Sequence, residues 1–405
     1  MADLATIIGS RRPTGESWPG VSLPQSTDVI VVGAGVVGLS IAWRLADAGR
    51  SVTVLERSEV GAGASLAATG MLAPAAEHEP GSDPLLPLAL DSLARWPAFR
   101  DDLEAASGID IDYRTQGTLV LAIGRDEVER LRFRHDLQTR SGIRARWLSG
   151  LEVREREPML RPAVTAGILC EDDHQVDPRK VMAALIRACR AAGVALVAPC
   201  PAQSLDWAGG QVRGVVTAQG RIAAGTVVLA SGAWSGERGL LPPELALPVR
   251  PIKGQALAVK TTARTGTLTH MVWTEQVHIA PKGDGDLIVG ATVEDCGFRA
   301  GLTVGGLYAL LEGARRVLPG IEEMEIGAVW SGYRPTSDDD APIVDRLAPG
   351  LVVATGHHRN GYLLTPATAD AVTALVDTGA VPDFARGFGL GRFEAAPRPG
   401  MRVPA

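Results

Sequence analysis

A glycine-rich turn near the start of the chain has the spacing that binds a dinucleotide pyrophosphate. It reads Gly33-Ala34-Gly35-Val36-Val37-Gly38 and directly follows the apolar run Asp28–Val32. In such a turn the first glycine permits a tight bend, the second lets the backbone approach the pyrophosphate, and the third lets a helix pack on the strand. The helix N-terminus then offers free N–H groups and a partial positive charge to the anion.

An acidic residue completes the dinucleotide pattern. Glu56 ends a second apolar run, Ser51–Leu55, where its carboxylate can accept hydrogen bonds from ribose hydroxyls. Between the two runs, Leu39–Ala48 has helical spacing of apolar residues, and Gly49 follows as a stop signal. Strand, helix and strand form one βαβ unit, so a turn without a ligand is the less favoured interpretation. The motif alone does not choose between FAD and NAD.

The next segment, residues 61–72, is poor in large side chains. It reads Gly-Ala-Gly-Ala-Ser-Leu-Ala-Ala-Thr-Gly-Met-Leu. Small residues let the backbone approach a bulky planar ligand closely. Composition alone also allows a small-residue helix packed on a neighbour.

This segment resembles the D-amino-acid-oxidase superfamily of FAD-dependent oxidoreductases, and in particular the glycine oxidases of thiamine biosynthesis (ThiO-like). Three further segments agree with that family: residues 251–255, 332–343 and 356–369, the last being the most specific for glycine-oxidase-like members. The resemblance runs from about Asp28 to Leu375. The family residues matched in the first segment are Gly63, Ser65, Ala67, Gly70, Met71 and Leu72.

The resemblance implies FAD as the cofactor and distributes its contacts along the chain. It places the pyrophosphate at the glycine-rich turn, the adenosine at Glu56 and Arg57, and the adenine side near Ala202. Residues 357–363 would wrap the isoalloxazine and the ribityl chain. The implied cofactor-binding residues are Gly33, Gly35, Val36, Val37, Gly38, Glu56, Arg57, Ala64, Ser65, Thr69, Gly70, Met71, Ala202, His357, His358, Asn360, Gly361, Tyr362 and Leu363.

Two arginines match the family's substrate end. Arg334 stands where the family binds the substrate carboxylate, and Arg359 matches a second arginine beside the substrate. Arginine suits this task because its planar fork pairs bidentately with a carboxylate. Without the resemblance, a surface or interdomain ion pair is the ordinary interpretation of an arginine. No acid–base residue is required, because a neutral substrate amine can expel hydride from Cα to a flavin.

One substitution departs from the family pattern. His278 occupies the place of a tyrosine that contacts the substrate, and Gln276 occupies a place that some members fill with histidine. On the run Val277–Ala280, His278 is predicted to face the substrate pocket and to add a pH dependence near its ordinary pKa of about 6.5. The alternative is a solvent-facing histidine on an edge strand. The departure puts glycine itself in doubt as the preferred substrate.

The predicted fold class is α/β, with a Rossmann-type FAD-binding domain that is discontinuous in sequence and a second substrate domain of antiparallel sheet plus helices. The FAD-binding domain is assigned to 27–110, 165–245 and 325–380, and the substrate domain to 111–164 and 246–324. A flexible leader, 1–26, and a loose tail, 381–405, flank them. The elements that support this division are the helices Asp177–Ala192 and Pro366–Asp377 and the strands Val194–Val197, Thr226–Ala230, Gln255–Val259, Val277–Ala280, Leu287–Val289 and Leu351–Ala354.

Composition excludes several other classes of protein. With 40 basic and 46 acidic residues, the formal net charge is −6, and no clustered basic face indicates nucleic-acid binding. The apolar runs are only strand-length, so no transmembrane helix is predicted. The four cysteines lack CxxC spacing, which argues against a metal site and fits a reducing cytoplasm. They are Cys170, Cys189, Cys200 and Cys296.

The favoured function is a cytoplasmic FAD-dependent amino-acid oxidase in thiamine biosynthesis. It would convert glycine or a small amino acid to an imine, then to oxo acid and ammonia, while oxygen becomes hydrogen peroxide. A homo-oligomer is expected, with no nucleic-acid or membrane partner. The alternatives are a D-amino-acid dehydrogenase that reduces a quinone, a sarcosine-oxidase-like flavoenzyme, and a non-catalytic flavin-binding protein. Sarcosine-oxidase-like enzymes often tether flavin to a cysteine, and no cysteine here falls in a matching motif.

The purified protein is therefore expected to be yellow, with FAD bound non-covalently. Acid precipitation should release the flavin into the supernatant, because only hydrogen bonds, packing and the helix N-terminus hold it. Absorbance of the supernatant and of the pellet measures the two fractions. Flavin that stays in the washed pellet would show a covalent link and overturn this expectation.

Overall fold

The apolar run before the glycine-rich turn is a central strand of a parallel sheet. In the computed structural model, which describes residues 22–237 and 239–393, β1 (Ser26–Val32) lies between β2 (Val52–Leu55) and β11 (Gly220–Leu229) and is parallel to both. Alternate residues of β1 enter hydrophobic cores on opposite faces of the sheet. Burial on both faces is the physical reason that this strand reads as a continuous apolar run.

The first sheet has eight strands in the order β17-β18-β11-β1-β2-β8, with the β9–β10 hairpin joined to β11. Strands β18, β11, β1, β2 and β8 are parallel, which confirms the expected Rossmann-type α/β architecture. Its further strands are β8 (Ala195–Val197), β9 (Ala202–Ala208), β10 (Gln211–Thr217), β17 (Ile343–Ala348) and β18 (Leu351–Thr355).

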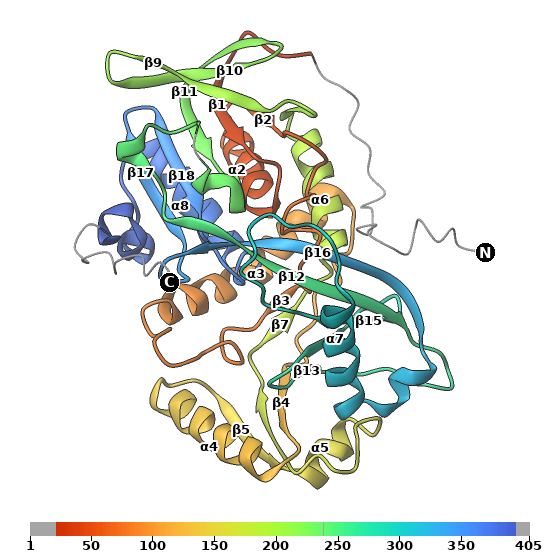
Figure 1. Cartoon of the computed structure of the whole chain (residues 1–405). Coiled ribbons are helices and arrows are strands. Elements are labelled where there is room, and N and C mark those ends of the chain that lie inside the picture. The colour runs from red at the N-terminus through yellow and green to blue at the C-terminus, as the bar shows by residue number, and fades with distance from the viewer. Residues whose placement is uncertain (1–21, 238, 394–405) are drawn as a thin grey trace, which may run out of the picture.

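Four helices cover one face of this sheet and share a core with it (Figure 1). The helix that directly follows the glycine-rich turn packs its apolar stripe on the sheet, as the spacing of its apolar residues predicts. The helices are α2 (Val36–Asp47), α3 (Leu86–Ser107), α6 (Pro178–Ala191) and α8 (Thr365–Thr378).

The second sheet also has eight strands and is mostly antiparallel, in the order β16-β12-β15-β14-β13-β4-β6-β5. Helices α4 (Arg125–Arg140), α5 (Gly150–Arg156) and α7 (Val304–Val317) lie around it (Figure 1). The strands are β4 (Thr118–Ala122), β5 (Ala145–Ser149), β6 (Ala166–Cys170), β12 (Val249–Lys260), β13 (Met271–Trp273), β14 (His278–Pro281), β15 (Asp286–Gly290) and β16 (Glu325–Ser337).

Short elements connect the two sheets and complete the chain. A two-stranded ribbon pairs β3 (Met71–Leu72) with β7 (His174–Gln175). The 3-10 helices are η1 (Gly232–Gly236), η2 (Pro243–Leu245), η3 (Pro319–Glu323), η4 (Asp383–Phe388) and η5 (Leu390–Phe393).

Sheet membership differs from the expected domain boundaries at two places. Strand β6 lies in the segment 165–245 and β16 in the segment 325–380, both assigned to the FAD-binding domain, yet both pair within the second sheet. Strand β16 pairs along its length with the 12-residue β12, and β6 pairs with β4 and β5, so backbone hydrogen bonds place both strands in the second sheet.

The ends of the chain also differ from expectation. In the expected loose tail, 381–405, the described part forms η4 and η5, and it buries Ala385 and Phe388 against the helical core. Residues 394–405, and residues 1–21 of the expected leader, lie outside the described residues. Within residues 22–237 and 239–393, no helix is long and apolar enough to span a bilayer.

Candidate active site

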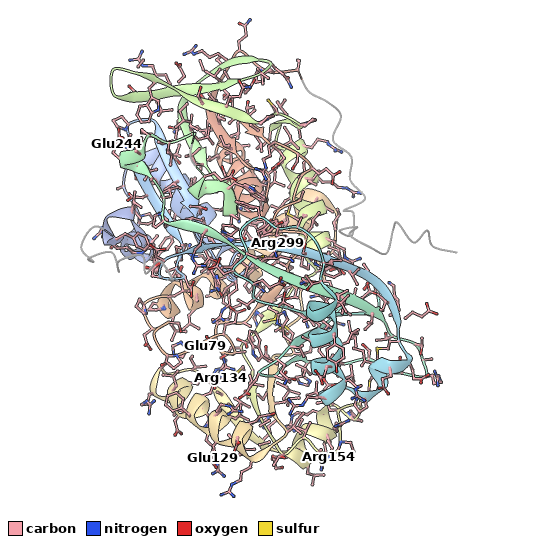
Figure 2. All side chains as sticks on the ribbon, in the orientation of Figure 1. Glu79, Glu129, Arg134, Arg154, Glu244 and Arg299 are labelled. Atoms are coloured by element: carbon pink, nitrogen blue, oxygen red, sulfur yellow. The ribbon has the colours of Figure 1, made fainter. Side chains whose placement is uncertain are left out.

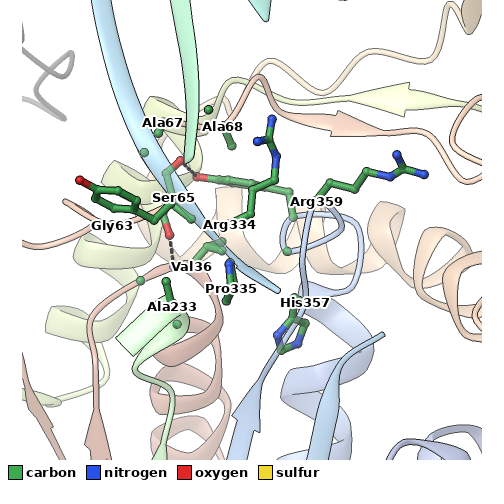
Figure 3. Close-up of a pocket in the computed structure, with 18 of the residues that line it drawn as sticks. Val36, Gly63, Ser65, Ala67, Ala68, Ala233, Arg334, Pro335, His357 and Arg359 are labelled. Carbon is green, nitrogen blue, oxygen red and sulfur yellow. Dashed lines mark hydrogen bonds between the residues drawn. The ribbon is translucent and has the colours of Figure 1, made fainter. Parts of the chain in front are cut away.

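A cavity of about 540 Å³ lies at the carboxyl ends of the parallel strands, where the second sheet meets them. The last residues of β1 and β2, Val32 and Leu55, line it, together with Ala230 after β11 and Thr355 at the end of β18. Ligands of open α/β sheets bind at this edge, because loops and helix N-termini converge there. The volume is in the range of ordinary small-molecule sites. Figure 3 shows part of the lining.

The three glycines of the turn occupy three different environments. Gly33 has φ +113°, and a Cβ on it would lie 2.5 Å from the Ala230 carbonyl oxygen. A Cβ on Gly38 would lie 2.0 Å from the Gly33 carbonyl oxygen, so this glycine allows helix α2 to pack on the turn. At Gly35 the backbone is extended and a Cβ would meet only the Ser65 hydroxyl, at 3.1 Å. The space over Gly35 opens to the cavity, as a pyrophosphate site requires.

Hydrogen bonds organise this end of the cavity. The N–H of Val36, in the first turn of α2, donates to the Ser65 hydroxyl at 2.9 Å, a bond drawn in Figure 3. Glu56 accepts from the N–H groups of Ala34 and Ser58, at 2.9 Å each. The carboxylate predicted for the ribose is therefore held at the turn. Arg57 lies beside it, with its guanidinium 3.8 Å from the centre of the Trp234 ring.

The small-residue segment, residues 61–72, begins as a series of turns. It packs against the loop of Tyr362, strand β16 and the loop after β7. The hydroxyl of Tyr362 donates to the Ser65 carbonyl at 2.9 Å, and the indole of Trp330 donates to the Ala67 carbonyl at 3.1 Å. Gly70 has φ +82°, and a Cβ there would lie 2.2 Å from the Val176 carbonyl oxygen. Small side chains are needed here because backbone packs on backbone, and residues 61–65 and 67–71 line the cavity.

Two histidines close the opposite wall of the cavity. The ring of His357 shares a hydrogen bond of 3.0 Å with the Thr368 hydroxyl, and that of His358 one of 2.8 Å with Thr336. Burial lowers the pKa of His357 to about 4. The pKa of His358 falls to about 3, through burial and the nearby Arg359. Both rings are therefore neutral at physiological pH.

Arg334 is a half-buried cation at the substrate end. It stands on β16 opposite Ile252, and one nitrogen, Nη1, donates to the Thr292 carbonyl at 3.1 Å. Its guanidinium lies over Gly254, where a Cβ would come within 2.7 Å of Nη1. In the described part of the chain, no carboxylate forms an ion pair with Arg334. The cation is thus placed in the cavity wall with a free edge of its fork.

Arg359 lines the same cavity but is already paired. Its Nε lies 2.9 Å from Oε2 of Glu77, and its Nη2 lies 3.3 Å from Oε2 of Glu79. Nη2 also donates to the Glu77 carbonyl at 3.0 Å. In Figure 3 both Arg334 and Arg359 extend away from Ala233 and the start of α2. The two arginines predicted at the substrate therefore have different partners.

His278 faces the cavity from β14, as its register predicts. Its ring stacks on that of Trp273, with centres 5.3 Å apart, and Nε2 is buried without a hydrogen-bond partner among the described residues. Burial, assisted by the positive charges of Arg334, Lys282 and Arg359, lowers the pKa of His278 to about 3. The expected titration near pH 6.5 is therefore wrong, because burial and the three neighbouring cations disfavour the charged form of the imidazole ring.

Most of the predicted site residues meet in this one cavity, but four do not line it. Gly38 lies behind the turn, and Ala202 begins β9 outside the cavity. The N–H of Asn360 donates to the His357 carbonyl, and the carbonyl of Leu363 accepts from the Ser92 hydroxyl of α3. The predicted residues that line the cavity are Gly33, Gly35, Val36, Val37, Glu56, Arg57, Ala64, Ser65, Thr69, Gly70, Met71, His278, Arg334, His357, His358, Arg359, Gly361 and Tyr362.

Glu77 and Trp234 are among the residues of the cavity wall that sequence reasoning missed. Glu77 follows the run Met71–Ala76, in which every residue is apolar, and an acid directly after such a run signals a buried carboxylate. Trp234 follows a strand end and supports Arg57. Among the described residues, no group of His, Cys, Asp and Glu could hold a metal ion, and the four cysteines are free.

Comparison with known proteins places these features in context. A family model described as FAD dependent oxidoreductase (DAO) matches residues 28–375. Glycine oxidase of Geobacillus kaustophilus (strain HTA426) is 37% identical over 86% of this chain and 93% of its own length. The crystal structure of glycine oxidase from Geobacillus kaustophilus gives a TM-score of 0.85, at 34% identity over 91% of this chain and 99% of that chain. The bifunctional protein ThiO/ThiG of Synechocystis is 34% identical over 93% of this chain and 56% of its own length.

The different surroundings of Gly35 and Gly38 predict different consequences of the same substitution. Gly35→Val should leave the apoprotein folded but abolish FAD binding, because the new side chain would fill the space over the turn. Gly38→Val is the matched control and should destabilise the fold itself, because its Cβ would overlap the Gly33 carbonyl. Thermal unfolding of the apoproteins and quenching of flavin fluorescence separate the two effects. A Gly35→Val protein that binds FAD normally would contradict this assignment of the pyrophosphate site.

Proposed function

Since the chain belongs to the family of FAD dependent oxidoreductases (DAO), we propose that it is an FAD-dependent oxidase of glycine or a small amino acid. The substrate amine becomes an imine, which hydrolyses to oxo acid and ammonia, and oxygen becomes hydrogen peroxide. The observation that carries the proposal is Arg334, a half-buried guanidinium without a carboxylate partner in the described chain, in the wall of the cavity.

The cavity fits FAD at its other end. The open space over Gly35 and the start of α2 would take the pyrophosphate, and Glu56 would take the ribose. Thr69 to Met71, His357 and Tyr362 would line the flavin. When bound, FAD would supply the acceptor for the two electrons that leave the substrate with hydride.

The chain's own residues orient the substrate. The fork of Arg334 would bind the substrate carboxylate, and its bond to the Thr292 carbonyl keeps the fork from turning. Neutral His278 forms a wall with Trp273, and its ring nitrogens can donate or accept a hydrogen bond. A histidine is smaller than a tyrosine, so this wall leaves room for a substrate somewhat larger than glycine.

The cellular setting is proposed on separate grounds. Free thiols in the described chain support a reducing cytoplasm, and we expect a homo-oligomer. The similarity to ThiO/ThiG supports a role in thiamine biosynthesis, and the similarity to glycine oxidases supports oxygen as the acceptor.

Anaerobic flavin reduction by glycine, sarcosine and D-amino acids tests the proposed function. The flavin of the parent protein should bleach, and Arg334→Ala should reduce kcat/KM by roughly two to four orders of magnitude while retaining FAD. Breaking one side of a buried pair costs about 3–5 kcal/mol, and each 1.36 kcal/mol is about tenfold in rate.

Two further variants sharpen the test of Arg334. Arg334→Lys should recover little activity, because an ammonium lacks the planar fork. Arg250→Ala, on the same sheet but paired at the surface with Asp295, should behave as the parent. Equal kinetics in the parent and Arg334→Ala would remove Arg334 from the substrate site.

The wall residue gives a prediction about substrate size. His278→Tyr should shift kcat/KM towards glycine over larger D-amino acids, because the larger ring takes up space in the cavity. It should leave the pH profile between 5 and 8 unchanged, since the lowered pKa of His278 keeps the ring neutral throughout that interval. Steady-state kinetics across the amine panel at several pH values measure both. Unchanged specificity would mean that the pocket is shaped elsewhere.

A further inference from the structure

The cavity contains a buried carboxylate, and the oxidation as proposed so far gives this carboxylate no role. Glu77 lies five residues beyond β3 and lines the cavity together with Arg334 and Arg359. It is 9% exposed. The other acids in the cavity wall are Glu56, which binds the glycine-rich turn, and Glu275, which pairs with Arg130 at the surface. Glu77 is thus the carboxylate at the substrate end of the described cavity.

The position of Glu77 is fixed by several neighbours. Arg359 holds Glu77 in two ways: its Nε forms the 2.9 Å ion pair with the carboxylate, and its Nη2 donates a hydrogen bond to the backbone carbonyl of Glu77. The loop before it is held by Asp173, which accepts from the N–H groups of Ala75 and Ala76 at 3.0 and 3.1 Å. Further out, Glu79 forms an ion pair with Arg359 and lies 3.4 Å from Arg134 of α4. Figure 2 labels Glu79 and Arg134.

The charges around Glu77 oppose one another. Burial raises its pKa, the cation of Arg359 lowers it, Glu79 raises it, and Arg334 and Arg134 lower it, with a result of about 7. Asp173 packs against the same loop, and burial raises its pKa to about 7 as well. A carboxyl group balanced in this way can gain or lose a proton near neutral pH. That property suits a general base rather than a permanent ion pair.

We propose that Glu77 binds the amino group of the substrate and accepts a proton from it before oxidation. One N–H bond of the substrate ammonium breaks and one O–H bond forms on Glu77, so the amine becomes neutral and the carboxylate becomes a carboxylic acid. The nitrogen lone pair is then free to assist departure of hydride from Cα. After product release, Glu77 returns its proton to solvent. This inference rests on the proposed function.

The proposal assigns different tasks to the two arginines. Arg334 has a free edge for the substrate carboxylate, whereas the Nε and Nη2 of Arg359 are engaged by Glu77 and Glu79. Arg359 is therefore a positioning residue that orients the base. An anion site and a cation site in one cavity together recognise the zwitterion of an amino acid. A plain carboxylic acid or a plain amine would satisfy only one of them.

The shape of the pH profile tests this role. In the parent holoenzyme, kcat/KM for anaerobic flavin reduction should fall as pH drops through the pKa of Glu77 near 7, because the protonated acid cannot accept a proton. This limb should stay at the same pH for substrates whose amines have different pKa values. In Glu77→Gln the rate at pH 7 should fall by roughly 100- to 10,000-fold. The remaining limb should then follow the amine pKa of each substrate.

A matched control separates a base from a structural carboxylate. Glu79→Gln removes a charge from the same arginine but lies outside the cavity lining. Because Glu79 raises the pKa of Glu77, this variant should move the limb only to lower pH, and the limb should stay independent of the substrate. A uniform loss of rate in Glu77→Gln with the limb unmoved would overturn the proposal. The same shift in both variants would also overturn it, because it would report the charge balance of Arg359. If the parent flavin is reduced by no amino acid, the proposed function fails instead.

Discussion

The site depends on the close approach of strand β16 to the small-residue segment that follows the dinucleotide fold. A Cβ on Gly332 would lie 2.3 Å from that of Ala67, and the indole of Trp330 binds the Ala67 carbonyl. From the other side, Tyr362 binds the Ser65 carbonyl. Protein interiors are close-packed, so any added side chain here would push the second sheet away from the first. Arg334 stands two residues beyond Gly332 and inherits its position from this contact.

Burial and nearby cations together set the charge of the titratable groups in the cavity. Burial, assisted by the charges of Arg334 and Arg359, lowers the pKa of His278 and His358, so these rings act as neutral hydrogen-bonding groups. Burial acts in the opposite direction on Glu77 and raises its pKa. Arg334 is half-buried and has no carboxylate partner in the described chain, which costs stability because a desolvated charge is expensive unless it is paired.

Local patterns were enough to predict the five parallel strands of the first sheet. The run before Gly33 reads as a strand buried on both faces, and the glycines, Glu56 and the following small residues are contiguous in the chain. By contrast, α3 was not predicted, although it is 22 residues long and buries Trp96 and Phe99. It carries Pro97 in its interior, which opposes a helix, and tertiary packing outweighs that local preference.

The sequence by itself determined the dinucleotide turn and the class of fold, because spacing and strand alternation are local properties of the chain. The carboxylate role expected of Arg334 and the face expected of His278 came from the resemblance to the family. Only the tertiary structure decided which charges meet. Glu77 and Arg359 are 282 residues apart, and their pairing leaves Arg334 as the free cation among the described cavity residues. The neutral state of His278 was likewise beyond the sequence. A pKa depends on burial and on charges brought close in space, and neither is written in the order of residues.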